Sequence, residues 1–141
     1  MGLKLKVNIS LDEKVLEEVS QKLNDKVAAL YAAVVPRTPV SRSRKGVRGT
    51  KKGHTGGHLR RNWGIIPAEI DGNSVVAFLY NNAHYAGHVN FGHRTRLGKG
   101  KAEKYKPKKD GKSYVKGQHF LEKALGDVGL DPTQLNPNYK K

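Results

Sequence analysis

The sequence predicts an α+β fold, in which a long N-terminal amphipathic helix packs on a small antiparallel sheet and is joined by a short C-terminal helix and long basic loops or arms. Apolar residues at helical spacing over residues 15–34 predict the long helix. Short alternating or β-branched segments on both sides of it predict the sheet. A length of 141 residues is expected to give one domain, over residues 1–130, followed by an exposed C-terminal tail at 131–141.

The first predicted elements are a strand and the long helix. Apolar and polar residues alternate from Leu3 to Ile9, the pattern of a half-buried strand. Ser10 and Glu13 are placed to form a capping box, and Pro36 is expected to end the helix because it forces the preceding residue out of the helical conformation. The predicted apolar face of the helix consists of Val15, Leu16, Val19, Leu23, Val27, Leu30, Tyr31 and Val34.

Residues 37–57 predict a mobile basic loop. No acidic residue occurs between Lys26 and Ala68, and the Gly-, Ser- and Thr-rich sequence has little apolar surface to offset the entropy of ordering. The segment lacks a Gly-x4-Gly-Lys-Ser/Thr run, which excludes a phosphate-binding P-loop. Six residues are candidates for a DNA-facing surface: Arg42, Arg44, Lys45, Arg48, Lys51 and Lys52.

A hairpin is predicted next. Apolar residues from Leu59 to Ile70 indicate a strand that meets Pro67 at an edge or a bulge. The sequence Asp71-Gly72-Asn73-Ser74 is typical of a hairpin turn. The β-branched and aromatic run from Ser74 to Tyr80 then favours a central strand.

The stretch Asn81–Arg96 combines three of the six histidines with two aromatic residues and two glycines. Within it, 83–91 is expected to form a short helix in which Tyr85, Val89 and Phe91 pack. Gly92 would then allow a sharp exit into an extended arm. We therefore interpret this stretch as a structural corner, with Arg94 and Arg96 as candidate contacts to other subunits or to DNA.

A second basic region covers residues 94–116, where ten Lys and Arg residues accompany only Glu103 and Asp110. The dipeptide Asp110-Gly111 favours a tight turn, so this arm is expected to be a long hairpin. Residues 117–125 predict the second helix, with Gly126 as its stop. Its core-facing residues are expected to be Phe120, Leu121 and Leu125.

Several classes of protein are disfavoured by composition. The chain has no cysteine, which excludes disulfides and thiolate metal sites. The histidine pairs His54/His58 and His84/His88 have i, i+4 spacing, but a zinc site needs a third ligand. No nucleophile elbow or paired-carboxylate arrangement is present. We expect no cofactor, no metal and no catalysis, and a soluble protein made in the cytoplasm that lacks a membrane span and a secretory signal.

The formal net charge of +15 argues for a polyanionic neighbour. Because the charge lies in two windows without aromatic interleaving, it favours non-specific contact with phosphates over recognition of bases. Solvated loops that meet acidic patches on protein partners are an equally good interpretation.

Three motifs then occur in order. Thr38-Pro39-Val40 precedes TGGHLRRNW at 55–63, YAGHVNFGHRTR follows at 85–96, and GQHFL closes at 117–121. This order resembles the tail-completion, or head–tail joining, proteins of long-tailed bacteriophages and of prophage-derived particles, which carry TPVDTGxLRxSW-like, YAxxVExGHRTR-like and GxxFxxxA segments. The chain departs from that pattern by inserting residues 41–54 and by placing Asn90 where the family often has Glu.

The resemblance implies a structural protein of the virion neck. It implies a homo-oligomeric ring, commonly a hexamer, between the head connector or stopper and the tail terminator or tail tube, with DNA in its lumen. The residues that match the motifs, and are therefore implied in assembly, are Thr55, Gly56, Leu59, Arg60, Trp63, Tyr85, Gly92, His93, Arg94, Arg96 and Phe120. The alternatives are a general nucleic-acid-binding protein and, less favoured, a histidine-metal hydrolase.

Overall fold

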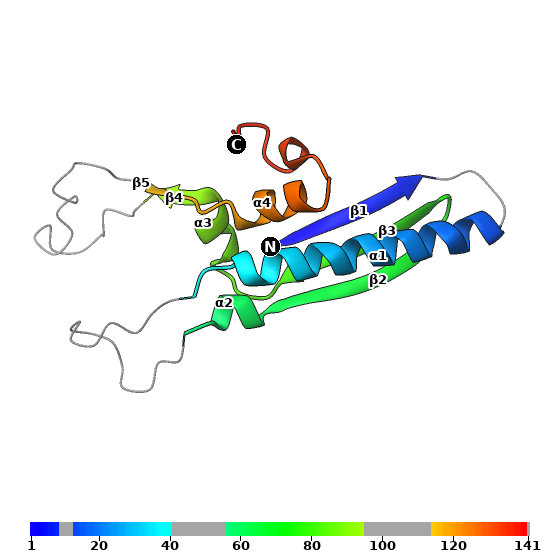
Figure 1. Cartoon of the computed structure of the whole chain (residues 1–141), viewed down its shortest axis with the longest axis horizontal. Helices are drawn as coiled ribbons and strands as arrows, with labels where there is room; N and C mark the ends of the chain where they lie inside the picture. The colour runs from blue at the N-terminus through cyan, green and yellow to red at the C-terminus, as the bar shows by residue number, and fades with distance from the viewer. Residues whose placement is uncertain (9–12, 41–55, 95–113, 141) are drawn as a thin grey trace, which may run out of the picture.

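A computed structural model describes residues 1–8, 13–40, 56–94 and 114–140, and it confirms the α+β class (Figure 1). The elements are β1 (Gly2–Asn8), α1 (Glu13–Arg37), α2 (His58–Arg61), β2 (Trp63–Asp71), β3 (Ser74–Asn81), α3 (Ala86–Phe91), β4 (Gly92–Arg94), β5 (Tyr114–Lys116), α4 (Phe120–Asp127) and the 3-10 turn η1 (Pro132–Gln134). Ser10 of the predicted capping box lies outside the described residues. No described helix has the length and apolar character needed to cross a bilayer.

The main sheet has the antiparallel order β1-β3-β2, which confirms β3 as its central strand. The predicted hairpin joins β2 to β3, and Gly72 adopts a positive φ of 59° in its turn. The predicted irregularity near Pro67 is a bulge between Ile66 and Glu69. It is held by α1, because the Ala68 N–H donates to the Asn24 Oδ1 at 2.7 Å. The strand begins only at Trp63, since the preceding residues form the helical turn α2.

Helix α1 lies over β2 and β3 and makes few contacts with β1. Its buried stripe is Leu23, Val27, Leu30 and Val34. Val15 and Tyr31, which we expected on the buried face, are exposed. The stripe is narrower than predicted because one sheet face supports one line of i, i+3 and i+4 positions, and Tyr31 is turned by about 100° from its neighbour in that line.

The prediction that Pro36 ends α1 is wrong. Pro36 lies inside the last turn of the helix. The helix continues to Arg37, and Thr38 then closes it. The Thr38 N–H and hydroxyl both donate to the Val34 carbonyl, at 3.0 and 2.8 Å. These two bonds satisfy the Val34 carbonyl at the end of the helix.

Helix α4 packs beside α1 and buries Phe120, Leu121 and Leu125, as predicted. Gly126 is not its stop, because the helix runs through this residue to Asp127. The reversal occurs at Gly129, whose φ is 75°, where the Leu130 N–H donates to the carbonyl of Leu125 at 2.9 Å. The predicted stop was three residues too early, since a helix ends where glycine adopts a left-handed conformation and not merely where it occurs.

The C-terminal segment is only partly exposed, in contrast to the expected free tail. Pro132 is buried, Leu135 packs against the core, and the Asn136 side chain is hydrogen-bonded to Glu122. Two side-chain oxygens of Asp131 accept hydrogen bonds from Thr133, which lowers the pKa of this exposed carboxyl.

Candidate functional site at the roots of two basic segments

The three sequence motifs converge at one end of the molecule. Figure 1 shows α2, β4 and β5 together at the end of the long axis opposite the β2–β3 turn. The described residues there flank two stretches, which we call the first basic segment (41–55) and the second basic segment (95–113). We use root region for the described residues around them: 36–40, 56–63, 85–94 and 114–122.

Trp63 and Arg60 fix the point where the chain leaves α1 for the first basic segment. The indole N–H of Trp63 donates to the Thr38 Oγ1 at 2.8 Å, and both side chains are buried. The Arg60 guanidinium donates to the Thr38 carbonyl at 2.8 and 3.1 Å and to the Pro36 carbonyl at 3.1 Å. These motif residues therefore act locally by positioning the backbone.

The opposite end of the first basic segment is held by α2. Gly57 precedes this turn with a φ of 94°, a conformation that a side chain would strain. Leu59 is buried in the core, and its carbonyl accepts a hydrogen bond of 2.8 Å from the side chain of buried Asn81. The Gly56 carbonyl accepts from the Arg61 guanidinium at 3.1 Å.

Tyr85 connects the two halves of the root region. Its hydroxyl is hydrogen-bonded to the His58 Nδ1 at 2.9 Å, and the two rings stack with centroids 5.9 Å apart. His58 belongs to α2, whereas Tyr85 caps the start of α3. Helix α3 therefore begins at Ala86, three residues later than expected. His84 precedes it, so His84 and His88 do not share a helix face.

Asn90 is the buried centre of the second root. Its side-chain amide donates to the Glu122 Oε2 at 2.8 Å, and its Oδ1 accepts from the Leu121 N–H at 3.0 Å. We had expected Phe91 to pack here, but Phe91 is exposed and Asn90 is fully buried. The reason is helical phase, since Asn90 lies four residues after buried Ala86 on the core-facing side of α3.

The chain returning from the second basic segment crosses α3 at very close range. The Gln118 and His119 N–H groups donate to the carbonyls of Val89 and Asn90, at 2.9 and 3.0 Å. A Cβ on Gly117 would lie 2.3 Å from the Asn90 carbonyl oxygen. Glycine is thus required at this crossing, because the backbone of residues 90–92 lies too close for a side chain.

Glu122 links the hydrogen bonds of Asn90 to the C-terminal segment. It is fully buried, and its Oε1 lies 3.2 Å from the His119 Nδ1 and 3.0 Å from the Asn136 Nδ2. Together with the bond from Asn90, three side chains satisfy one buried carboxyl group, which is the condition for burying such a group at tolerable cost.

A short antiparallel pair of strands forms the base of the second basic segment. Strands β4 and β5 pair antiparallel, with Gly92 opposite Lys116 and His93 opposite Val115. Gly92 has φ 88° and ψ 170°, which glycine alone adopts without strain. The expected turn at Asp110-Gly111 lies outside the described residues, as do Thr55, Arg96 and the six candidate DNA-facing residues Arg42, Arg44, Lys45, Arg48, Lys51 and Lys52.

The described histidines show packing and hydrogen bonding. The rings of His88 and His93 contact each other, with centroids 5.4 Å apart, and the His93 Nδ1 lies 3.4 Å from the His88 carbonyl. Among the described residues, no group of three His, Asp or Glu side chains is arranged to hold a metal ion.

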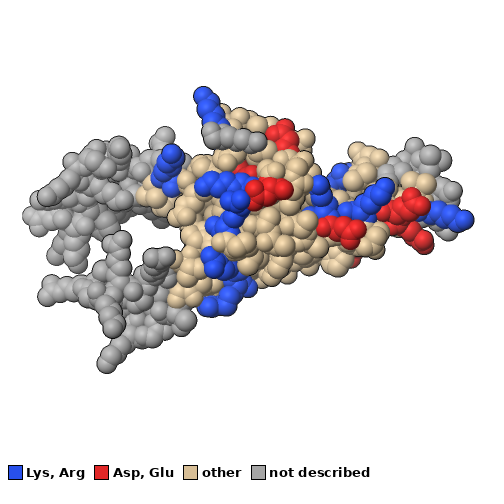
Figure 2. Space-filling model, in the orientation of Figure 1, with Lys and Arg blue, Asp and Glu red and all other residues tan. Residues whose placement is uncertain are grey.

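Charge is concentrated beside the root region. The two basic segments contain fourteen of the 27 Lys and Arg residues and only two of the twelve acidic ones. On the face shown in Figure 2, Lys and Arg side chains lie near the larger grey regions, and over the other half of the molecule Lys and Arg are interspersed with acidic side chains. The charge of the two basic segments attracts polyanions, and the root region anchors the ends of both segments. The described part of the chain contains no catalytic constellation.

A comparison with protein-family models adds a decisive observation. Residues 4–92 match the HK97-gp10-like family, described as "Bacteriophage HK97-gp10, putative tail-component". The chain belongs to this family. Searches of curated proteins and of solved structures found no match.

Membership of the HK97-gp10-like family makes this chain a structural component of the phage tail, and hence of the virion. It agrees with the resemblance drawn from the motifs. The matched region runs from β1 to Gly92 and includes α1, the sheet, α2 and α3. The second basic segment, β5 and α4 lie beyond it.

Four residues that hold the root region together were missed in the sequence: Thr38 as an acceptor, Asn81, Asn90 and Glu122. A sequence signal existed only for Glu122, an acidic residue on the apolar face of the predicted helix. The Thr38–Trp63, Asn81–Leu59 and Asn90–Glu122 bonds span 25, 22 and 32 positions, so local patterns do not reveal them.

Proposed function

We propose that this tail component is a ring subunit of the phage neck, which completes the tail and joins it to the head connector or stopper. The observation that carries the proposal is that hydrogen bonds hold the flanks of both basic segments at one end of a tail-component fold. A subunit with one strongly basic end suits a channel that DNA passes through, because contact there must be independent of sequence.

In this proposal the core and the segments have separate roles. The root region holds the entry and exit of each segment in place, so that contact of a segment with a neighbour or with DNA requires little rearrangement of the core. The partners are neighbouring copies, the head connector or stopper, the tail terminator or tail tube, and DNA in the lumen through non-specific contact.

The first test is assembly. The full chain would be studied by light scattering and electron microscopy, alone and mixed with the tail-tube or terminator protein of its own phage. We expect a ring in solution, or a monomer that becomes a ring on tail ends. A chain that stays monomeric in both conditions would refute the proposal.

The second test uses the arginine pair at the second root. In a phage lacking the native gene, Arg94→Ala with Arg96→Ala should leave folding unchanged and reduce the yield of joined particles, with free heads and tails accumulating. Lys14→Ala with Lys140→Ala, two exposed positions outside the root region, is the matched control with the same loss of charge. Equal yields from both pairs would show that these arginines have no role in assembly.

A general nucleic-acid-binding function is the second candidate, favoured by the charge of the two segments. It predicts tight binding of duplex DNA by the isolated chain, with a steep salt dependence. Neutralising the six Lys and Arg residues between 42 and 52 should then reduce the slope of log K against log salt by about 0.9 for each phosphate that the chain no longer neutralises. Weak binding at about 150 mM salt, unchanged by the neutralisation, would exclude this function.

A further inference from the structure

The main sheet has two open edges of opposite charge. In the part of the chain that the structure describes, β1 and β2 each pair with β3 alone, so neither has a strand along its outer edge. Such an edge presents backbone N–H and C=O groups that can accept a further strand. The exposed charged residues are Lys4 and Lys6 on β1, but Glu69 and Asp71 on β2.

The strand register places opposite charges at the same height, by which we mean the same position along the direction of the strands. Lys6 and Glu69 both pair with Val76 of the central strand. Residues paired across a sheet point to the same face. Because Val75 and Ala77 contact α1, Val76 and its two partners lie on the face away from that helix. The outer face therefore has a cation at one edge and an anion at the other, on one level.

Apolar groups match in the same way on the other face. Val7 and Ile70 both pair with Val75, which is fully buried beneath α1. Yet Val7 is 37% exposed and Ile70 is 56% exposed. Two large aliphatic side chains thus stand at opposite edges of one sheet, at equal height, without complete cover from the rest of their own chain.

We propose that neighbouring copies join edge to edge, with β1 of one copy beside β2 of the next. The inference deepens the proposed ring and rests on it. Rotation about an axis parallel to the strands keeps every residue at its own height, so Lys6 meets Glu69 of the next copy and Val7 meets Ile70 of the next copy. Since β1 and β2 both run antiparallel to β3, the joint is parallel.

Charge also selects this joint over a two-fold dimer. Pairing β1 with a second β1 would bring lysines together, and pairing β2 with a second β2 would bring carboxylates together; both arrangements are repulsive. A joint between two different edges repeats in one direction, which generates a ring where the rotation closes. Beyond the bulge at Pro67, Glu69, Ile70 and Asp71 form an uninterrupted stretch of β2.

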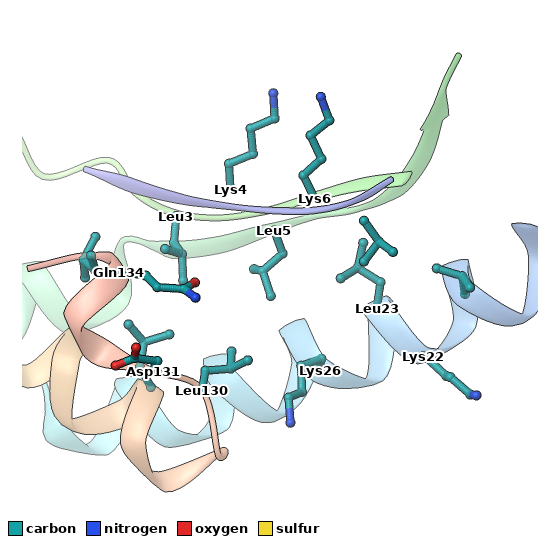
Figure 3. A pocket seen from close by; sticks show the side chains of 14 residues that line it. Leu3, Lys4, Leu5, Lys6, Lys22, Leu23, Lys26, Leu130, Asp131 and Gln134 are labelled. Atoms are coloured by element: carbon teal, nitrogen blue, oxygen red, sulfur yellow. The ribbon is translucent and has the colours of Figure 1, made fainter. Parts of the chain in front are cut away.

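An apolar groove beside β1 also favours a second copy of the chain as the neighbour at this edge. Figure 3 shows Leu3 and Leu5 pointing from β1 toward the helices, while Lys4 and Lys6 point away. The groove encloses about 750 Å³ and has mostly leucine and valine walls. It exists because α1 lies over β2 and β3. In the proposed joint the next copy's α1, carried on its β2, arrives beside the open rim of the groove at Val7.

A disulfide test is clean because the chain contains no cysteine. Val7→Cys and Ile70→Cys would be combined in one full-length chain. Within a chain the two positions are two strand spacings apart, about 9–10 Å, which exceeds the reach of a disulfide. Oxidation should therefore produce a ladder of covalent multimers on non-reducing gels.

The matched control combines Val7→Cys with Ile66→Cys. Ile66 is an exposed residue of the same strand, but it pairs with Phe78 and so lies at another height and on the other face. We expect at least a tenfold smaller yield of multimers from the control pair. Equal yields from both pairs, or no multimers from Val7 with Ile70, would overturn the inference.

Charge exchange gives an independent measurement. Lys6→Glu should weaken self-association about tenfold, because it replaces attraction with repulsion at each joint. Adding Glu69→Lys should restore association to within about threefold of the native chain. Lys4→Glu is the control, because it changes the same charge on the same strand at a height where the next copy presents Ile66. Failure of Glu69→Lys to restore association would overturn the pairing.

Running the oxidation on assembled particles separates this inference from the proposed function. If particles contain the chain but Val7→Cys with Ile70→Cys gives no multimers, the edge joint is refuted and the neck role stands. If the purified chain forms the ladder but is absent from particles, the joint stands and the neck role fails.

Discussion

Replacing Gly117 by alanine tests whether the root region depends on close backbone packing. The added Cβ would lie 2.3 Å from the Asn90 carbonyl oxygen, 2.5 Å from the Phe91 carbonyl carbon and 2.6 Å from the Gly92 nitrogen. Carbon atoms in contact are normally about 3.5 Å or more apart. All three neighbours are backbone atoms, so the crossing chain must move by about 1 Å.

The size of this movement determines the expected loss in the free energy of unfolding. Overpacking of this kind costs about 1–3 kcal/mol. The two hydrogen bonds beside the crossing, from Gln118 and His119 to α3, contribute about 0.5–1.5 kcal/mol each and would be stretched or broken. We therefore expect Gly117→Ala to lower the free energy of unfolding by about 3–4 kcal/mol. For a domain of this size that corresponds to a fall in Tm of about 10–15 °C.

Gly87→Ala is the matched control, measured by the same thermal and urea denaturation. Gly87 lies in α3, and a Cβ there meets nothing within 4 Å. The substitution should be neutral or stabilise the fold by up to about 1 kcal/mol, since alanine favours a helix. A Tm for Gly117→Ala within about 2 °C of the native protein, or an equal loss from Gly87→Ala, would refute the reasoning.

Three further predictions concern the same region. Gly92→Val should lower stability by about 1–3 kcal/mol, because φ 88° with ψ 170° is strained for any side chain, and unchanged urea denaturation would contradict this. Asn90→Leu should cost about 2–5 kcal/mol, because it removes one of the three partners of the buried Glu122 carboxyl and leaves the Leu121 N–H without its side-chain acceptor, whereas exposed Asn82→Leu should change the Tm little. Trp63→Phe should cost about 1–2 kcal/mol by removing the N–H that holds Thr38, with circular dichroism unchanged at 25 °C.

The regular elements could be predicted because their signals are local. Alternation over Leu3–Val7 and the turn at Gly72 each identify an element within a few residues, and so does the stripe from Leu23 to Val34. The misplaced ends have a shared cause. Residue type alone predicts helix ends at Pro36 and Gly126. The actual ends of α1 and α4 depend on hydrogen bonds from Thr38 and on the conformation of Gly129.

The sequence named several residues of the candidate site but did not predict their contacts. The motif residues Arg60, Trp63 and Tyr85 gather in one place, whereas the sequence linked them only through the family motifs that they match. Their contacts are with partners 22–27 positions away, namely Thr38 and His58, which no spacing rule identifies. The Asn90–Glu122 bond spans 32 positions and joins regions inside and outside the family match.

The two proposals constrain each other through geometry. The root region lies at one end of the sheet's long axis, and the proposed joint runs along its sides. A ring built by rotation about an axis parallel to the strands would therefore place the roots of every basic segment on one rim. Each copy adds fourteen Lys and Arg residues there, and mutual repulsion at that rim grows with every copy joined. A polyanion threaded through the ring would relieve this repulsion. DNA should then promote closure of the ring, and self-association should strengthen with added duplex and with added salt. If both left association unchanged, the charged ends would not share a rim, even if the edges were shown to meet.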